Sequence, residues 1–204
     1  MSTVFFRHDK PGHPARHRSA ASTRLQVLPG PRSDAPPAVE AAGTGEVAGT
    51  RQHATLRVLL VCSTGGHLTH LVRLSEWWSQ HERSWVTFDK PDARSLLAGE
   101  RTWWAYHPTT RNLVALVRNF LLAVSVLLRE RPDVVVSSGA GVALPFFVVA
   151  KALGVRTVYL EVYDRITMPT LTGRLCAPLS DLFLLQWEEQ RQAYPKGRVV
   201  GRLF

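Results

Sequence analysis

The sequence has few of the features that mark secreted and membrane-spanning proteins. Only two of its 204 residues are cysteines, Cys62 and Cys176. Both fall in stretches that we expect to be buried, so two reduced thiols of a cytoplasmic protein are the simplest interpretation. The amino-terminal stretch contains charges and prolines but no continuous apolar segment, so no signal peptide is expected. No run reaches the roughly 20 apolar residues that cross a bilayer.

Acidic residues are also scarce, with 16 Asp and Glu against 25 Lys and Arg and a formal charge of +9. Such a charge suits nucleic acid, an anionic membrane surface or a phosphate-bearing substrate. The basic residues are scattered and are mostly arginines. No compact basic run, zinc-knuckle spacing or RNA-binding signature is present, so we expect no nucleic-acid partner.

Residues 1–55 differ from the rest of the chain. They contain six prolines and many Ala, Gly, Ser and Arg residues without sustained periodicity. This composition predicts a disordered, mildly basic extension. A segment that lies on a membrane, a linker and a start codon assigned too early all remain open. The predicted folded domain is residues 56–204.

From residue 56 onwards, apolar strand-like runs alternate with helical patterns. The predicted strands are residues 56–62, 85–88, 102–106, 133–138, 155–162 and 181–185. The predicted helices are residues 68–80, 93–98, 112–129, 142–153, 172–179 and 186–194. This alternation predicts an α/β fold with a doubly wound, mostly parallel, Rossmann-like sheet.

The helix predicted near residues 112–129 has an unusual composition. Arg111, Arg118, Ser125 and Arg129 fall on one narrow line, and nearly all other positions are Leu, Val, Phe or Ala. Such a helix is buried on most sides or rests on lipid or a partner with a thin polar stripe. We favour burial against the sheet. The central Arg118 and the short length argue against a transmembrane helix.

The first candidate site is the turn Ser63-Thr64-Gly65-Gly66-His67, between a buried strand and a helix. Glycines after a strand let a ligand approach the backbone, and this arrangement often binds an anion or a sugar phosphate. The turn lacks both the P-loop lysine and the G-x-G-x-x-G pattern, so dinucleotide binding is weakly supported. His67 is a candidate general base or phosphate contact, or a structural histidine that donates to a carbonyl.

Further candidates follow two other strands. Ser138, Gly139 and Gly141 form a second glycine turn after the strand at 133–138. Because the carboxyl ends of parallel strands meet at one sheet edge, both turns are expected to face one ligand.

Glu161, Asp164 and Arg165 follow the fifth strand, where they would act as a base, bind sugar hydroxyls or pair with each other. His67 and His70 lack a completing carboxylate or cysteine, so no metal is expected.

Five motifs together resemble a known family. They are residues 64–67 (TGGH), 135–139 (VVSSG), 160–165 (LEVYDR), 171–175 (LTGRL) and 181–187 (DLFLLQW). The sequence resembles the acceptor-side, membrane-recruiting subunit of the two-part UDP-N-acetylglucosamine transferase of dolichol-linked oligosaccharide synthesis. It is also similar to paired bacterial capsule and exopolysaccharide glycosyltransferase subunits, and the resemblance covers residues 56–204.

The resemblance implies the N-terminal half of a GT-B glycosyltransferase, the half that handles the acceptor. A separate partner subunit would bind the UDP-sugar, and no other cofactor is implied. The implied reaction is an inverting, metal-independent transfer of GlcNAc, a related hexose or a uronic acid to a polyprenyl-diphosphate-linked acceptor. His67 would be the leading base and Glu161 the second. The implied acceptor-binding residues are Thr64, Gly65, Gly66, Ser138, Gly139, Gly141, Asp164 and Arg165.

A non-catalytic alternative also follows from the resemblance. The chain would then be a membrane scaffold that recruits and activates the catalytic subunit, with residues 199–204 as the docking edge. Eukaryotic relatives usually begin with a transmembrane helix, whereas this chain has a basic, proline-rich stretch there. We therefore expect peripheral attachment to the cytoplasmic face of the cytoplasmic membrane, through the basic face and the helix at residues 113–128.

Overall fold

The computed structural model describes residues 54–109 and 112–202. The predicted extension at residues 1–55 lies almost entirely outside this range, and the division of the chain at residue 55 stays a prediction.

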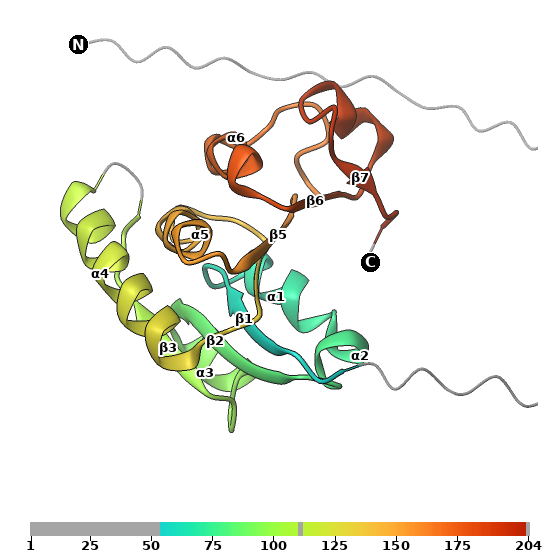
Figure 1. Ribbon diagram of the computed structural model, residues 1–204. Coiled ribbons are helices and arrows are strands. Elements are labelled where there is room, and N and C mark those ends of the chain that lie inside the picture. Colours follow the sequence, from blue (N-terminus) through green and yellow to red (C-terminus); the bar gives the residue numbers. More distant parts are fainter. Residues whose placement is uncertain (1–53, 110–111, 203–204) are drawn as a thin grey trace, which may run out of the picture. The chain divides into compact units, whose positions relative to one another are not determined.

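The described residues form one sheet of seven parallel strands in the order β3-β2-β1-β4-β5-β6-β7 (Figure 1). The chain moves outward from β1 to β3 and then returns to the other side of β1 with β4. The strands are β1 (Arg57–Val61), β2 (Glu82–Phe88), β3 (Thr102–Ala105), β4 (Val134–Ser137), β5 (Arg156–Leu160), β6 (Leu182–Leu185) and β7 (Arg198–Val199). This doubly wound parallel sheet confirms the predicted Rossmann-like α/β class.

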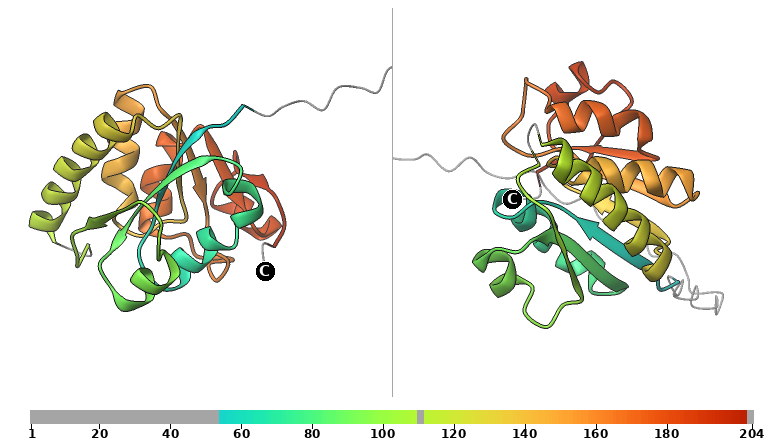
Figure 2. Two further views of the ribbon diagram at one scale, coloured as in Figure 1. Left: turned by 90° about the horizontal axis from the view of Figure 1, so that it is seen from below. Right: turned by 90° about the vertical axis from the view of Figure 1, so that its left-hand side faces the viewer.

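Helices cover both faces of the sheet, as the views in Figures 1 and 2 show. Residues of α1 and α3 pack with Val58 and Leu60 of β1. Residues of α4, α5 and α6 pack with Leu59 and Val61. Successive strand residues point to opposite faces, so a continuous apolar strand supplies both cores. The helices are α1 (Gly66–Val72), α2 (Ser75–Trp78), α3 (Pro91–Leu96), α4 (Leu113–Glu130), α5 (Ala143–Ala152) and α6 (Leu171–Cys176), with 3₁₀ turns η1 (Ala177–Leu179) and η2 (Glu188–Gln192).

Two local predictions need correction. The helix expected at residues 68–80 is divided into α1 and α2. The Leu71 carbonyl, which a continuous helix would use, accepts a 2.8 Å hydrogen bond from the Trp78 indole. The helix expected at residues 186–194 is only the 3₁₀ turn η2, and the two-residue strand β7 was not predicted.

The helix at residues 112–129 packs against the sheet as predicted, but it is not buried on most sides. Five residues of α4 are buried, and three of them, Ala115, Asn119 and Ala123, are small or polar. The other two are Val126 and Leu127, whereas most of the remaining large apolar side chains point outward. Those more than half exposed are Leu113, Val114, Val117, Leu121 and Leu128, at 73, 63, 52, 65 and 56%. Within residues 54–109 and 112–202, no helix has the length and apolar character needed to cross a bilayer.

Candidate functional site

A cavity of ≈ 480 Å³ lies at the carboxyl ends of β1 to β4. The volume falls within the range of about 300–1,000 Å³ that is usual for ligand sites. Both glycine turns contribute to it, since His67 and Gly141 are among its residues. The full lining is Ser63, His67, Phe88, Lys90, His107, Pro108, Thr109, Ala140, Gly141, Thr170 and Thr172. The structure thus brings the two turns to one cavity.

The His67 imidazole joins the two turns. Its Nδ1 lies 2.7 Å from the Ser138 carbonyl oxygen, and the Ser138 hydroxyl donates a 2.7 Å hydrogen bond to the His67 carbonyl. Because a carbonyl oxygen only accepts, Nδ1 bears the proton and Nε2 keeps its lone pair.

Burial lowers the pKa of His67, against smaller raising effects of the Ser138 carbonyl and the Asp164 carboxylate. A neutral imidazole with a defined tautomer at a cavity can accept a proton at neutral pH.

Gly139 and Ser138 are buried and fix the position of His67. The Gly139 backbone has φ 109°, and a Cβ there would lie 2.6 Å from the Tyr159 hydroxyl and 3.2 Å from His67 Cε1. Their burial argues for positioning rather than the predicted substrate contact. Gly141 does line the cavity.

The first glycine turn is already partly occupied by the protein itself. The Gly65 amide donates a 2.9 Å hydrogen bond to Asp92 Oδ2, where a ligand phosphate was expected. The Thr64 carbonyl accepts a 3.3 Å hydrogen bond from the Ser63 hydroxyl. At Gly66 an added Cβ would meet nothing within 4 Å, so packing does not require glycine there.

Glu161 does not face the cavity, which corrects its predicted placement. Glu161 is fully buried, with 0% of its surface exposed. Oε1 accepts from the Val162 amide at 3.1 Å. Among the described residues, Oε2 has no partner of good hydrogen-bond geometry, although the Tyr194 hydroxyl lies in the same small space beside Gly173. Burial raises the pKa of the carboxyl, an effect that the Tyr194 hydroxyl only partly offsets. A shielded carboxyl cannot take a proton from an acceptor in this conformation.

Asp164 and Arg165 are exposed and are not among the residues that line the cavity. No ion pair joins them to each other or to Glu161 within the part of the chain that the structure describes, so the predicted mutual salt bridge is absent there. The charge of Asp164 raises the pKa of His67, an effect smaller than the lowering by burial.

Several cavity residues were not identified from the sequence. Lys90 follows β2 and His107 follows β3, and both therefore reach the same sheet edge as the glycine turns. Their position just after a predicted strand could have identified them as cavity residues from the sequence. Thr170 and Thr172 come from the start of α6, which no short motif places at this edge.

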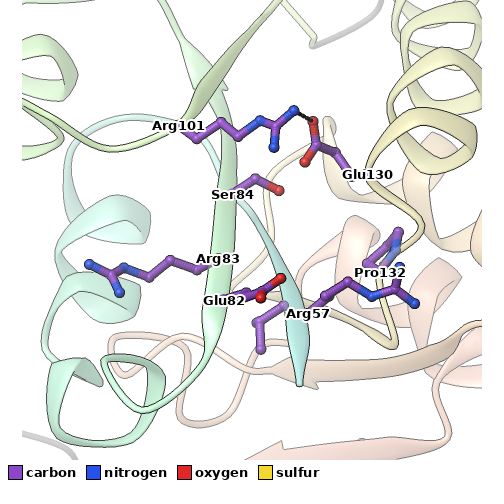
Figure 3. Close-up of a pocket in the computed structure, with 8 residues that line it drawn as sticks. Arg57, Glu82, Arg83, Ser84, Arg101, Glu130 and Pro132 are labelled. Carbon is purple, nitrogen blue, oxygen red and sulfur yellow. Dashed lines mark ion pairs between the residues drawn. The ribbon is translucent and has the colours of Figure 1, made fainter. Parts of the chain in front are cut away.

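A smaller, charged pocket of ≈ 90 Å³ lies at the opposite end of the strands (Figure 3). Its arginines each have an acidic partner. Arg57 pairs with Asp133 at 3.1 Å, Arg83 pairs with Glu100 at 2.6 Å, and Arg101 pairs with Glu130 at 3.1 Å. Because these charges are already neutralised, we assign no ligand to it. In the described ranges, no group of three or more His, Cys, Asp and Glu residues could hold a metal ion.

Glu161→Gln is expected to stabilise the fold increasingly as pH rises. A carboxyl whose pKa is raised in the folded state stabilises that state below its unfolded pKa, and this contribution is lost as pH rises through the folded pKa. The free energy of unfolding of the variant minus that of wild type should grow by at most about 1.4 kcal/mol per pH unit. Urea unfolding from pH 4 to 8 measures it. Glu189→Gln, at an exposed position, is the matched control. Parallel profiles for wild type and Glu161→Gln would contradict the expectation.

Comparison with protein families gives a match to "Oligosaccharide biosynthesis protein Alg14 like" over residues 101–203. Three similar proteins are named UDP-N-acetylglucosamine transferase subunit ALG14. The mouse protein is 28% identical over 181 residues, which cover 73% of this chain and 83% of that protein. The human protein is 25% identical with the same coverage. The Candida albicans protein is 26% identical and covers 74% of this chain and 79% of its own length.

Solved structures support the fold. Acinetobacter baumannii MurG matches with a TM-score of 0.55 and 16% identity, over 65% of this chain and 41% of its own length. The UDP-N-acetylglucosamine 2-epimerase of Rickettsia bellii matches with a TM-score of 0.58 and 15% identity, over 73% of this chain and 45% of its own. The chain therefore spans less than half of these solved chains.

Proposed function

Because the chain belongs to the Alg14-like family of oligosaccharide biosynthesis proteins, we propose that it is the acceptor-side subunit of a two-chain glycosyltransferase. The reaction transfers a sugar, GlcNAc or a related hexose or uronic acid, from a UDP-sugar to a polyprenyl-diphosphate-linked acceptor. The partner subunit supplies the UDP-sugar site. The observation that supports this most directly is the His67–Ser138 pair, which holds a neutral imidazole at the cavity.

The proposed chemistry is a single displacement with inversion. The acceptor hydroxyl gives its proton to His67 Nε2 while its oxygen forms a bond to the anomeric carbon of the donor. The bond from that carbon to the UDP oxygen breaks, and UDP leaves with the electron pair. Lys90 and His107 line the same cavity and are placed to face the acceptor diphosphate.

Reconstitution with the partner tests the proposal. The candidate is a protein of similar size that binds UDP-sugars and is encoded beside this chain. Radiolabelled sugar should pass from UDP-GlcNAc to a GlcNAc-diphosphate-prenyl acceptor only when both chains are present. A partner that is fully active alone, and unchanged by this chain, would contradict an obligate pair.

We also propose that α4 rests on the membrane surface. Its exposed apolar residues form a continuous face, and Arg118 and Arg129 are exposed on the same helix. Apolar burial at the interface and attraction to anionic lipids reinforce each other. The cytoplasmic face of the cytoplasmic membrane follows, since UDP-sugars are cytoplasmic donors.

Leu121→Glu should lower binding of the paired subunits to anionic liposomes at least about tenfold, because burial of a leucine side chain contributes about 1.5–3 kcal/mol. Flotation measures this binding. Leu96→Glu is the matched control, since Leu96 is half exposed but lies on α3, across the sheet. A wild-type pair that stays wholly soluble beside anionic liposomes would refute the membrane proposal.

The scaffold alternative rests on the β7 edge of the sheet. Among the described strands, β7 pairs only with β6, and the adjacent Val200 is 44% exposed. An unpaired strand edge can accept a strand from another chain. Residues 203–204 of the predicted docking edge lie outside the described residues. The His67 experiment in the Discussion separates the two roles.

A further inference from the structure

A second, apolar cavity adjoins the polar one. It is a groove of ≈ 640 Å³ between the first turns of α4, α5 and α6. Its residues are Thr109, Asn112, Leu113, Leu116, Gly141, Leu144, Leu171, Thr172 and Leu175. We call it the leucine groove. Leu113 and Leu171 in it are each 73% exposed, so two large apolar side chains of one hollow are left to water.

The leucine groove is continuous with the polar cavity. Thr109, Gly141 and Thr172 line both. At their junction a Cβ on Gly141 would lie 2.9 Å from Thr109 Cβ, so the α5 turn packs directly on the segment after β3. One side of this junction has His67, Lys90 and His107, and the other side has leucines. A molecule that occupies both must have a polar head joined directly to an apolar tail.

The walls of the leucine groove suit an apolar chain that forms no hydrogen bonds. Asn112 Oδ1 accepts from the Ala115 amide at 2.9 Å, and Thr170 Oγ1 accepts from the Gly173 amide at 2.9 Å. The helix caps beside the leucines are therefore satisfied within the protein. A peptide strand would bring its own amides to walls that offer them few partners.

We propose that the leucine groove binds the isoprene units next to the diphosphate of the acceptor, an assignment that rests on the proposed function. When the diphosphate lies in the polar cavity, the first isoprene unit, which is joined to it through an ester oxygen, passes Gly141 and enters the groove. The acyl chains of membrane phospholipids are less suitable occupants, because the ends of these chains have no polar group that could occupy the polar cavity. The protein thus binds the part of the acceptor lipid next to the diphosphate. The rest of α4 contacts the membrane.

The test compares three soluble probes by calorimetry on the purified full-length chain without membranes. Farnesyl diphosphate presents a branched prenyl tail, dodecyl diphosphate a straight tail of equal main-chain length, and inorganic diphosphate no tail. The test variant is Leu113→Ser with Leu171→Ser. Both positions are the first residues of capped helices and are largely exposed, so the fold is expected to stay intact. The matched control is Leu121→Ser with Leu128→Ser, which changes two exposed leucines of α4 outside the groove.

Wild type and the control are expected to bind farnesyl diphosphate at least about tenfold more tightly than inorganic diphosphate, a difference of about 1.4 kcal/mol. They should also prefer farnesyl to dodecyl diphosphate. The groove variant should lose both preferences and keep its affinity for inorganic diphosphate. Equal binding of farnesyl and dodecyl diphosphate, or an unchanged preference in the groove variant, overturns the assignment. If the wild-type chain prefers farnesyl diphosphate but the reconstituted pair transfers no sugar, the proposed function is refuted instead.

Discussion

His67→Ala lowers the turnover of the reconstituted pair by about 10²–10⁴-fold, the usual contribution of a positioned general base. The imidazole is neutral because burial lowers its pKa, and the Ser138 carbonyl fixes the Nδ1 proton so that Nε2 is the accepting atom. Without it, no group at the same position can accept the proton. Single-turnover kinetics at saturating acceptor measure the effect separately from product release.

The pH profile gives an independent readout of the same residue. Because the pKa of His67 is lowered from 6.5, the wild-type rate should be at its plateau at neutral pH and fall as pH drops through the depressed value. His67→Asn keeps an amide N–H near the Nδ1 position and can still donate to the Ser138 carbonyl, so it should keep the fold and lose the acidic limb.

His81→Ala is the control, since His81 contacts Trp77, its ring centroid 5.3 Å away, and does not line the cavity. Full activity of a His67→Ala pair would remove His67 from catalysis and favour the scaffold role.

The doubly wound, parallel class of the sheet was predictable because its signals are local. Continuous apolar runs such as residues 58–61 are typical of strands buried on both faces, and alternation with helices implies parallel pairing. The same reasoning brought Gly66 and Gly141 to one edge, because strand ends of a parallel sheet coincide.

The placement of Glu161 was not predictable in that way. Tyr159 and Glu161 alternate onto the same face of the sheet, and Tyr159 packs against Phe147 of α5. Whether that face is open or covered beyond the end of β5 depends on where α6 returns, which is a tertiary fact. Only the packing shows that the carboxyl is enclosed.

The extent to which α4 is buried was misjudged for a related reason. Ala115, Asn119 and Ala123 are spaced by four residues and form its inner face together with Val126 and Leu127. Asn119 uses its amide to bond both the amide and the carbonyl of Tyr106, each at 2.9 Å. Small side chains allow α4 to pack closely, and most of its large leucines remain outside. Hydrophobicity alone assigns every large residue to the core, whereas most of those in α4 are exposed.

Gly139→Ala is expected to destabilise the fold and abolish most transfer activity. At φ 109° an L-residue is strained by about 1–3 kcal/mol, and the new Cβ would lie 2.6 Å from the Tyr159 hydroxyl. Relief of that contact must displace Tyr159 or the turn that holds His67. Gly154→Ala is the matched control, because Gly154 has φ 72° but an added Cβ would meet nothing within 4 Å. Urea unfolding and turnover of the reconstituted pair should show a modest stability loss and normal activity for the control.

A double-mutant cycle separates the contact from the backbone strain. Tyr159→Phe removes the hydroxyl that the new Cβ would meet, so Gly139→Ala should cost less in the Tyr159→Phe background than in wild type. A coupling of about 0.5–3 kcal/mol is the usual range for residues in contact. Turnover should recover in parallel, because the His67–Ser138 hydrogen bonds can then re-form with less distortion. Strictly additive free energies would show that backbone strain alone determines the requirement for glycine, and that the contact with Tyr159 does not position His67.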